Sequence, residues 1–194
     1  MVVYKQESVS NLIRDEFVAV RITPETPEVF RTFAVNNVPT FIIVGADGFE
    51  YERCSGFLDA DGLVAFCLLA LGKVYYDRHE KATAQRYLER LLLTYPQSPY
   101  VPEGIFLRGI CLYLISQDPT HLTESFLHLS ENHPDSIWTK RSLVLHFHPS
   151  AVFDWDAECR QHRDYWDSQD AFAKCFATYF NWPPHYQVPK KDNR

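Results

Sequence analysis

The side chains best suited to chemistry in this 194-residue chain are its five cysteines. Thiol–disulfide exchange needs a thiolate with a lowered pKa and a second thiol nearby, as in a Cys-x-x-Cys motif. The chain has no such motif, and its cysteines are Cys54, Cys67, Cys111, Cys159 and Cys175. An odd number at wide spacing predicts no disulfide framework and is typical of a reducing compartment. We expect Cys54 to be structural, and Cys67 and Cys111 to be small core residues, because both stand in apolar runs.

A second group of residues has the spacing of metal ligands. His-x-His and Cys-x-x-His spacings could present ligands to a transition metal, and the residues are His146, His148, Cys159 and His162. Partly exposed histidines beside a helix end have the same spacing. Because these residues straddle Pro149 and belong to different elements, we expect no metal site and no cofactor. No nucleophile elbow or glycine-rich phosphate loop occurs either, so no catalytic residue is assigned.

The most informative stretch is the corner formed by Val38, Pro39 and Thr40. An apolar strand that leaves a proline and is closed by Asp47-Gly48 is typical of a tight corner feeding a β-hairpin. Such a corner suits a cis peptide bond, although a cis X-Pro bond costs about 0.5 to 1 kcal/mol relative to trans. Two interpretations stay open, and both can hold. The corner fixes the sheet, or its exposed edge pairs with an extended peptide as an added strand, which makes these three residues the candidate peptide-binding site.

Composition limits the partners of the chain. The net charge is −6 and no run of lysine or arginine occurs, so we expect no nucleic acid and no membrane surface as partner. The first residues do not have the pattern of a signal peptide, and the longest apolar run, from Leu63 to Leu71, is too short to span a bilayer. We therefore expect a cytoplasmic protein.

The elements that position the corner can be predicted from periodicity. Residues 6–14 read as the end of a helix, and residues 17–22 as a strand that is apolar at nearly every position and therefore covered on both faces. Thr26 and Pro27 begin a helix that runs to the break at residues 36–37. Residues 41–44 and 49–54 form the hairpin strands. Asp59 caps the next helix, whose apolar positions form one helical stripe.

These elements resemble the second half of a thioredoxin domain over residues 1 to about 72. The matching features are the strand at residues 17–22, Val38-Pro39-Thr40, the Asp47-Gly48 turn, Glu50, Arg53, Gly56 and the apolar helix that follows. In that family the cis-proline corner faces a Cys-x-x-Cys pair and holds a substrate's extended backbone. The resemblance implies a central strand between residues 17–22 and 41–44, which these 194 residues do not contain, because Met1 falls within the helix after the redox motif. Without that strand, the apolar edges of the strands at residues 17–22 and 41–44 would face a gap.

An internal repeat begins after Leu71. Tyr95-Pro-Gln-Ser recurs as His133-Pro-Asp-Ser, which is typical of stacked helical hairpins. The unit resembles the tetratricopeptide repeat, with small residues where paired helices approach closely. The matching residues are Leu71, Gly72, Tyr75, Ala84, Leu88 and Pro96 in the first unit, and Gly109, Leu112, Phe126 and Pro134 in the second. Leu91 stands where the family prefers alanine, and the second unit needs one extra residue. A third helix is expected to end near His146. Two interpretations of residues 72–146 stay open: they hold a protein or peptide ligand on a concave face, or they only cover the thioredoxin-like half.

The sequence therefore predicts α/β plus all-α architecture: a partial thioredoxin-like sheet at 1–70, tetratricopeptide-like repeats at 71–148, and an aromatic-rich helical extension at 149–194 docked on the repeats. The expected function is protein or peptide binding without redox cysteines. The alternative is a thioredoxin-family thiol-disulfide oxidoreductase, an enzyme of cell redox homeostasis, whose Cys-x-x-Cys lies upstream of Met1. Exposed strand edges also predict homo-oligomers or aggregation of the isolated chain.

Overall fold

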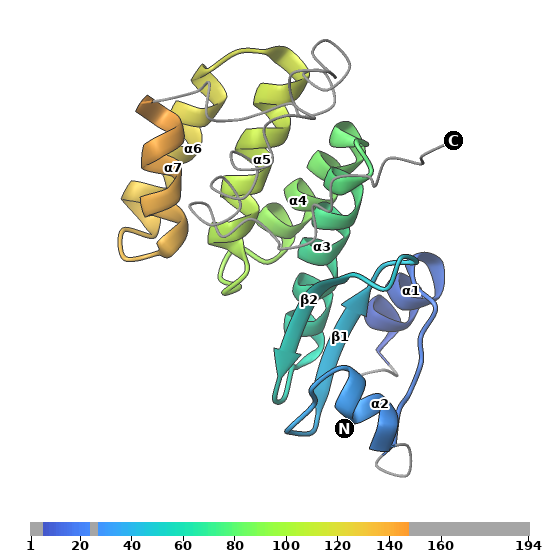
Figure 1. Cartoon of the computed structure of the whole chain (residues 1–194). Helices are drawn as coiled ribbons and strands as arrows, with labels where there is room; N and C mark the ends of the chain where they lie inside the picture. Colours follow the sequence, from blue (N-terminus) through green and yellow to red (C-terminus); the bar gives the residue numbers. More distant parts are fainter. Residues whose placement is uncertain (1–5, 24–26, 148–194) are drawn as a thin grey trace, which may run out of the picture.

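The computed structural model describes residues 6–23 and 27–147, and these ranges form seven helices and two strands. The elements are α1 (Glu7–Glu16), α2 (Pro27–Thr32), β1 (Thr40–Val44), β2 (Glu50–Ser55), α3 (Ala60–Asp77), α4 (Lys81–Thr94), α5 (Val101–Ser116), α6 (Thr120–Asn132) and α7 (Ile137–Phe147). Figure 1 shows the β-hairpin with α1 and α2 at one end of the molecule and α4 to α7 at the other, with α3 reaching both. The expected mixture of an α/β part and a helical part is confirmed at this level.

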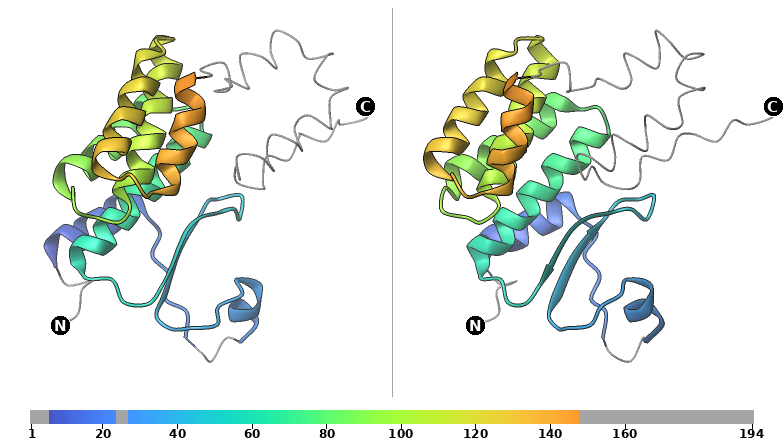
Figure 2. Two further views of the ribbon diagram at one scale, coloured as in Figure 1. Left: turned by 90° about the vertical axis from the view of Figure 1, so that its left-hand side faces the viewer. Right: turned by 60° about the vertical axis from the view of Figure 1, so that its left-hand side comes forward.

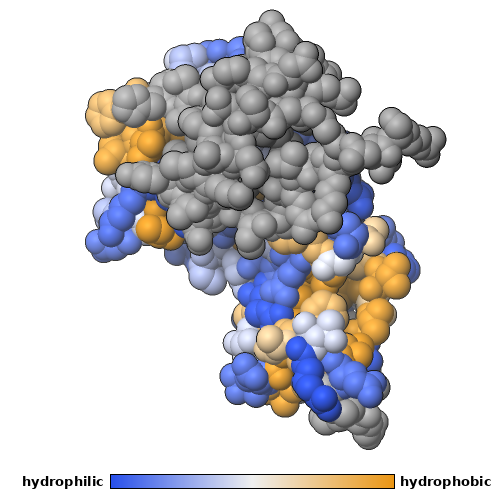
Figure 3. All heavy atoms as spheres, in the orientation of Figure 1, coloured by the Kyte–Doolittle hydropathy of each residue, from blue (hydrophilic) through white to orange (hydrophobic). Residues whose placement is uncertain are grey.

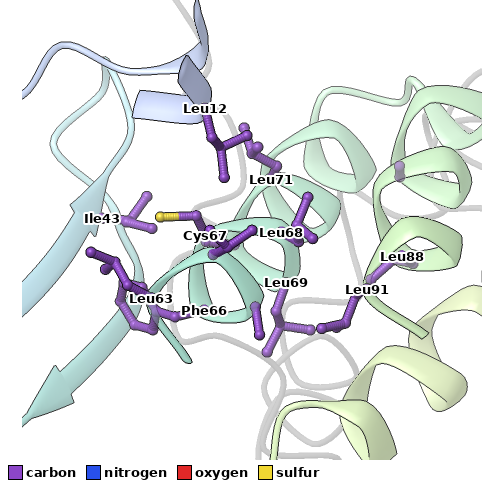
Figure 4. Close-up of a cluster of buried hydrophobic side chains, with 14 of the residues drawn as sticks. Leu12, Ile43, Leu63, Phe66, Cys67, Leu68, Leu69, Leu71, Leu88 and Leu91 are labelled. Atoms are coloured by element: carbon purple, nitrogen blue, oxygen red, sulfur yellow. The ribbon is translucent and has the colours of Figure 1, made fainter. Parts of the chain in front are cut away.

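Helix α3 forms the centre of the hydrophobic core. It begins at Asp59, whose Oδ1 accepts a hydrogen bond from the backbone N–H of Gly62 at 2.8 Å, so the predicted N-cap is confirmed. Every residue from Leu63 to Gly72 is buried, because α1 and the hairpin cover one side of the helix and α4 and α5 cover the others. Figure 4 shows side chains of α1, β1 and α4 meeting those of α3 in one cluster. The predicted boundary at residues 70/71 falls inside this helix.

Strands β1 and β2 form an antiparallel hairpin, as predicted. Phe41 pairs with Cys54 and Ile43 with Glu52, and the register shifts by one residue at the end near the turn. Paired residues of antiparallel strands point to the same face. The face that carries these four side chains packs on α3, where the rings of Phe41 and Phe66 meet at 6.5 Å between centroids.

The opposite face of the hairpin carries Ile42 and Arg53, which also pair. The Arg53 guanidinium donates to the carbonyl oxygen of Phe33 at 2.6 Å, one residue beyond the end of α2. Figure 2 shows α2 on the side of the hairpin away from α3. Helices therefore cover both faces of the hairpin, with α3 on one face and α2 on the other. Helix α2 is shorter than the predicted helix to residues 36–37, since Ala34 takes a positive φ of 48° that ends it.

From α3 to α7, each helix packs against the next one along the chain. Helix α5 also contacts α3 and α7. Close approach within each pair depends on glycine, as the sequence predicts. A Cβ at Gly72 of α3 would lie 2.5 Å from Cδ2 of Leu88 on α4, and a Cβ at Gly109 of α5 would collide with Ser125 of α6. The predicted third helix is confirmed as α7. The helix expected at residues 156–180 lies outside the described residues.

One predicted strand is wrong. Residues 17–22 are a connection and pair with no strand within residues 6–23 and 27–147. They are not covered on both faces either, since Val18 is 93% exposed and Val20 is 74% exposed. The physical reason is that β structure requires a hydrogen-bonded neighbour, and the described part of the chain places none beside this segment. Among the described helices, none has both the length and the apolar character needed to cross a membrane.

Substitution of Gly72 by valine tests the helix contact. We expect the free energy of unfolding to fall by about 1 to 3 kcal/mol, because the added side chain overlaps buried Leu88. Chemical denaturation measures the change, with Ala82→Val on the exposed side of α4 as the control. The double variant Gly72→Val/Leu88→Ala should lose less stability than the sum of the two single variants. Strict additivity would contradict the contact.

Candidate functional site

The corner at Val38, Pro39 and Thr40 lies at the start of β1 and has the expected cis peptide bond between Val38 and Pro39. Two hydrogen bonds hold it in place. Thr40 Oγ1 donates to the carbonyl oxygen of Asn37 at 2.6 Å, and the N–H of Gly56 donates to the carbonyl oxygen of Pro39 at 2.8 Å. The Val38 side chain is 68% exposed. The three candidate residues are therefore together, and they present backbone and an apolar side chain to solvent.

The backbone of β1 has one paired edge and one unpaired edge. Pro39 and Gly45 bond to the β2 side, through Gly56 and Phe49 respectively. Because successive residues of a strand point their N–H and C=O groups to opposite sides, Phe41 and Ile43 also face β2. The groups of Thr40, Ile42 and Val44 then point away from β2. Within the described residues, no backbone partner meets them.

Residues 17–23 run alongside this unpaired edge, as Figures 1 and 2 show. Within the described part of the chain, residues 18–22 form no backbone–backbone hydrogen bond. Their apolar side chains at Val18, Val20 and Ile22 are exposed. Figure 3 shows apolar surface gathered on this end of the molecule. We call residues 17–23 together with the outward groups of Thr40, Ile42 and Val44 the edge site.

A partly buried ion network fixes the hairpin that carries the edge site. Lys73 Nζ of α3 lies 2.5 Å from Oε2 of Glu52 on β2 and 2.6 Å from Oε1 of Glu103 on α5. Burial raises the pKa of the Glu103 carboxyl, which Lys73 only partly offsets. Burial alone would lower the pKa of the Lys73 ammonium, but Glu103 and Glu52 outweigh it and the pKa is raised. One cation therefore holds three elements together.

Cys67 and Cys111 do not have the properties of redox nucleophiles. Cys67 and Cys111 are buried, and burial raises the pKa of each thiol to about 12. Cys54 is partly buried on β2, and all three are free thiols. A thiol that stays protonated at neutral pH is a poor nucleophile. This agrees with the core positions expected for Cys67 and Cys111, whereas Cys159 and Cys175 lie outside the described ranges.

The predicted metal-ligand spacing can be followed only at its first residue. His146 Nδ1 lies 3.1 Å from Thr123 Oγ1, and its ring stacks on Phe126 with 5.0 Å between centroids. His148, Cys159 and His162 lie outside the described residues. Among residues 6–23 and 27–147, no group of three or more histidine, cysteine or carboxylate side chains is arranged to hold a metal ion.

A small open pocket of about 280 Å³ lies where the hairpin end meets the turn between α4 and α5. Its lining residues are Phe57, Leu58, Asp59, Gly62, Pro99 and Tyr100. Sites for small molecules and cofactors usually enclose about 300 to 1,000 Å³. The volume of this pocket lies just below that range and is close to the volume of one large side chain.

Two features of the site escaped sequence reasoning. The first is Lys73, although a lysine directly after the apolar run of residues 63–72 signals a charge that needs partners. Residues 17–22 were read as a covered strand because their composition is that of a buried strand. Composition alone cannot show whether a neighbouring strand is present.

Replacing Lys73 by methionine tests the ion network. We expect a loss of up to about 3 kcal/mol in unfolding free energy at pH 8, because Glu52 and Glu103 stay partly buried without their cation. Burial raises the pKa of the Glu103 carboxyl, and without that cation nothing offsets the rise. Stability of the variant should therefore fall as pH rises through the titration of Glu103, and the deficit should be smaller at pH 4.5. Unfolding at both pH values measures it, with exposed Lys140→Met as the control. A deficit independent of pH would contradict this explanation.

Thiol accessibility gives a second test. In a variant with Cys159 and Cys175 replaced by serine, we expect Cys67 and Cys111 to react with an aromatic disulfide reagent only after denaturation, because both are buried. Titration of released thiolate before and after adding guanidinium measures the difference. Removal of Cys54 by serine shows which part of the native signal belongs to that residue. Rapid native reaction of the remaining two thiols would contradict the packing described here.

Comparison of the chain with protein-family models, with curated proteins and with solved structures finds no match.

Proposed function

We propose that the chain is a protein-binding module that accepts an extended segment of a partner protein as an added strand on β1, beside Val38, Pro39 and Thr40. The observation that supports this best is the unpaired outer edge of β1, whose outward groups have no backbone partner in the described residues. Such an edge is a template for another chain. In strand addition, main-chain hydrogen bonds supply affinity and side-chain contacts supply specificity.

The anchoring of the hairpin supports the same proposal. An isolated two-stranded hairpin is at best marginally stable, and a binding edge must keep its shape to avoid ordering costs on association. Here the ion network of Lys73 and the bond from Arg53 to Phe33 hold β2 on both faces. The edge of β1 is therefore presented by a supported hairpin.

The finer assignment of the fold belongs to this proposal. The hairpin part would be the second half of a thioredoxin-like domain, supported by the cis bond before Pro39, the Asp59 cap and the position of the hairpin. Helices α3 to α7 would be tetratricopeptide-like hairpins, supported by the close contacts at Gly72 and Gly109. Such an array serves as a platform for the hairpin and offers a second protein-binding surface. Buried Cys67 and Cys111 favour binding over thiol chemistry among the described residues.

Amide exchange tests strand addition directly. Peptides selected on the chain from a random dodecapeptide display library serve as probes, and exchange of backbone amides is followed by NMR. In the free chain, the amides of Phe41 and Ile43 should already be protected, because they face β2. On peptide binding, the amides of Thr40, Ile42 and Val44 should exchange at least tenfold more slowly, because they gain partners.

A variant provides the control for this experiment. Val44→Pro removes one outward N–H, a change that edge strands tolerate, and it should weaken peptide binding about threefold to tenfold. Val44→Thr keeps the N–H and should bind as the parent does. Peptides that bind without slowing the three outward amides would show that the edge of β1 is not the site.

A further inference from the structure

Helix α7 lies at the end of the helical array away from the hairpin (Figure 1), and it repeats the local structure of α5. The turns before the two helices have the same bonds. The N–H of Ser98 donates to the carbonyl oxygen of Tyr95 at 2.9 Å, and the N–H of Ser136 donates to that of His133 at 3.0 Å. Each serine Oγ also accepts a bond from the N–H two residues later. Residues of α5 and α7 can therefore be compared one by one.

The two helices differ in what covers one of their faces. Ile105 and Phe106 of α5 are 3% and 7% exposed, whereas the equivalent Leu143 and Val144 of α7 are 40% and 42% exposed. On α5 the cover comes from the next two helices. The ring of Phe106 meets that of Trp138 on α7 at 5.1 Å between centroids, and α5 packs along α6. Within the described residues, no helix takes this place on α7.

The uncovered side of α7 is one continuous surface. Residues three and four apart lie side by side on a helix. Four exposed apolar side chains and one exposed lysine line this side, and we call them the α7 face: Ile137, Lys140, Leu143, Val144 and Phe147. The other side, with Ser142 and Leu145, is buried. A helix that is apolar all round is normally buried, so α7 has the composition of a helix between two neighbours.

Residues 148–194 follow α7 directly and lie outside the described residues. Their sequence contains a segment, residues 164–180, that is amphipathic at helical spacing. Its rings fall on one side: Tyr165, Phe172, Phe176, Tyr179 and Phe180. Its charged side chains fall on the other: Asp164, Asp167, Asp170 and Lys174. Because each aromatic side chain can bury about 150 to 250 Å², this segment needs an apolar surface to cover its rings.

Charge and reach favour this segment over a second copy as the cover of the α7 face. Residues 154–170 have six acidic and two basic side chains, whereas α7 has Lys140 and Arg141 and no acidic residue. The α7 helix of a second copy would bring like charges together. The connection at residues 148–163 can span about 50 Å at about 3.3 Å per residue. Helix α7 is only about 16 Å long, so the segment can reach all of its face.

We infer that residues 164–180 form an amphipathic helix whose aromatic side packs on the α7 face of the same chain. Sequence alone predicts docking of this extension on the repeats, and the difference between α5 and α7 identifies the surface. The α7 face is then an internal contact and is closed to partner proteins. This inference does not rest on the proposed function, because it concerns the end of the array away from β1.

Photo-crosslinking in the full chain tests the contact. With p-benzoylphenylalanine in place of Lys140, irradiation should join this position to residues 164–180 within the monomer band, as mass spectrometry of the digested band identifies. The same probe in place of Arg86, which is exposed on α4, should give no crosslink to that segment. Crosslinking into a dimer band would make a second copy the occupant. Crosslinks from position 140 to another part of the chain, or none, would overturn the inference.

Amide exchange followed by NMR provides an independent test. Residues 172–180 should be protected in the parent chain. Val144→Asp and Phe176→Asp should each speed their exchange by about tenfold or more, because the docked segment opens more often, whereas the amides of α3 should exchange as in the parent. The matched control is Leu93→Asp, since Leu93 is 83% exposed on α4, and it should leave residues 172–180 protected. Lack of protection in the parent, or protection unchanged by both variants, would contradict docking on α7.

Discussion

The partly buried cation of Lys73 is the constraint on which the position of the hairpin depends. Its two carboxylate partners come from β2 and α5, elements about fifty residues apart in the sequence, and Lys73 itself belongs to α3. Removing charges from water is unfavourable, so a network of this kind persists only when each charge has its counterpart. The arrangement therefore specifies which face of the hairpin meets which side of α3. Packing around Phe41 and Ile43 buries apolar surface, but this burial is not directional and would also occur if the hairpin packed on α3 in a shifted position.

The hairpin is asymmetric in a way that gives the molecule its candidate function. Strand β2 carries Glu50, Glu52 and Arg53, and each finds an ionic or backbone partner within the protein. Strand β1 carries no charge, and its outer groups have no backbone partner in the described residues. Proteins usually cover or charge such an edge. The proposed strand addition starts from this uncharged edge beside the exposed Val38.

Local signals predicted the parts of the fold whose causes are local. Asp59 is followed three residues later by the N–H it caps, and Asp47-Gly48 has the chemistry of a tight turn, with Gly48 at a φ of +84°. Glycines at helix contacts were also readable, because small residues recur at fixed spacing. The prediction of a strand at residues 17–22 was wrong for the opposite reason. Its composition is that of a buried strand, yet pairing is a property of the neighbour as well as of the segment. The ion network of Lys73 is not predictable from local signals either, since its two partners are distant in sequence.

Helix α3 gives the molecule a further property. Its first turns carry the hairpin and α1, while the same helix packs along α4 and contacts α5, and one hydrophobic cluster extends from Val9 and Leu12 of α1 to Leu107 and Cys111 of α5. No exposed linker separates the two parts within the described residues 27–147. Loss of the helical half would uncover one side of α3, and loss of the hairpin half would uncover the other. The two halves should therefore melt together as a single cooperative unit, and neither half can be excised at α3 as an independently folding fragment.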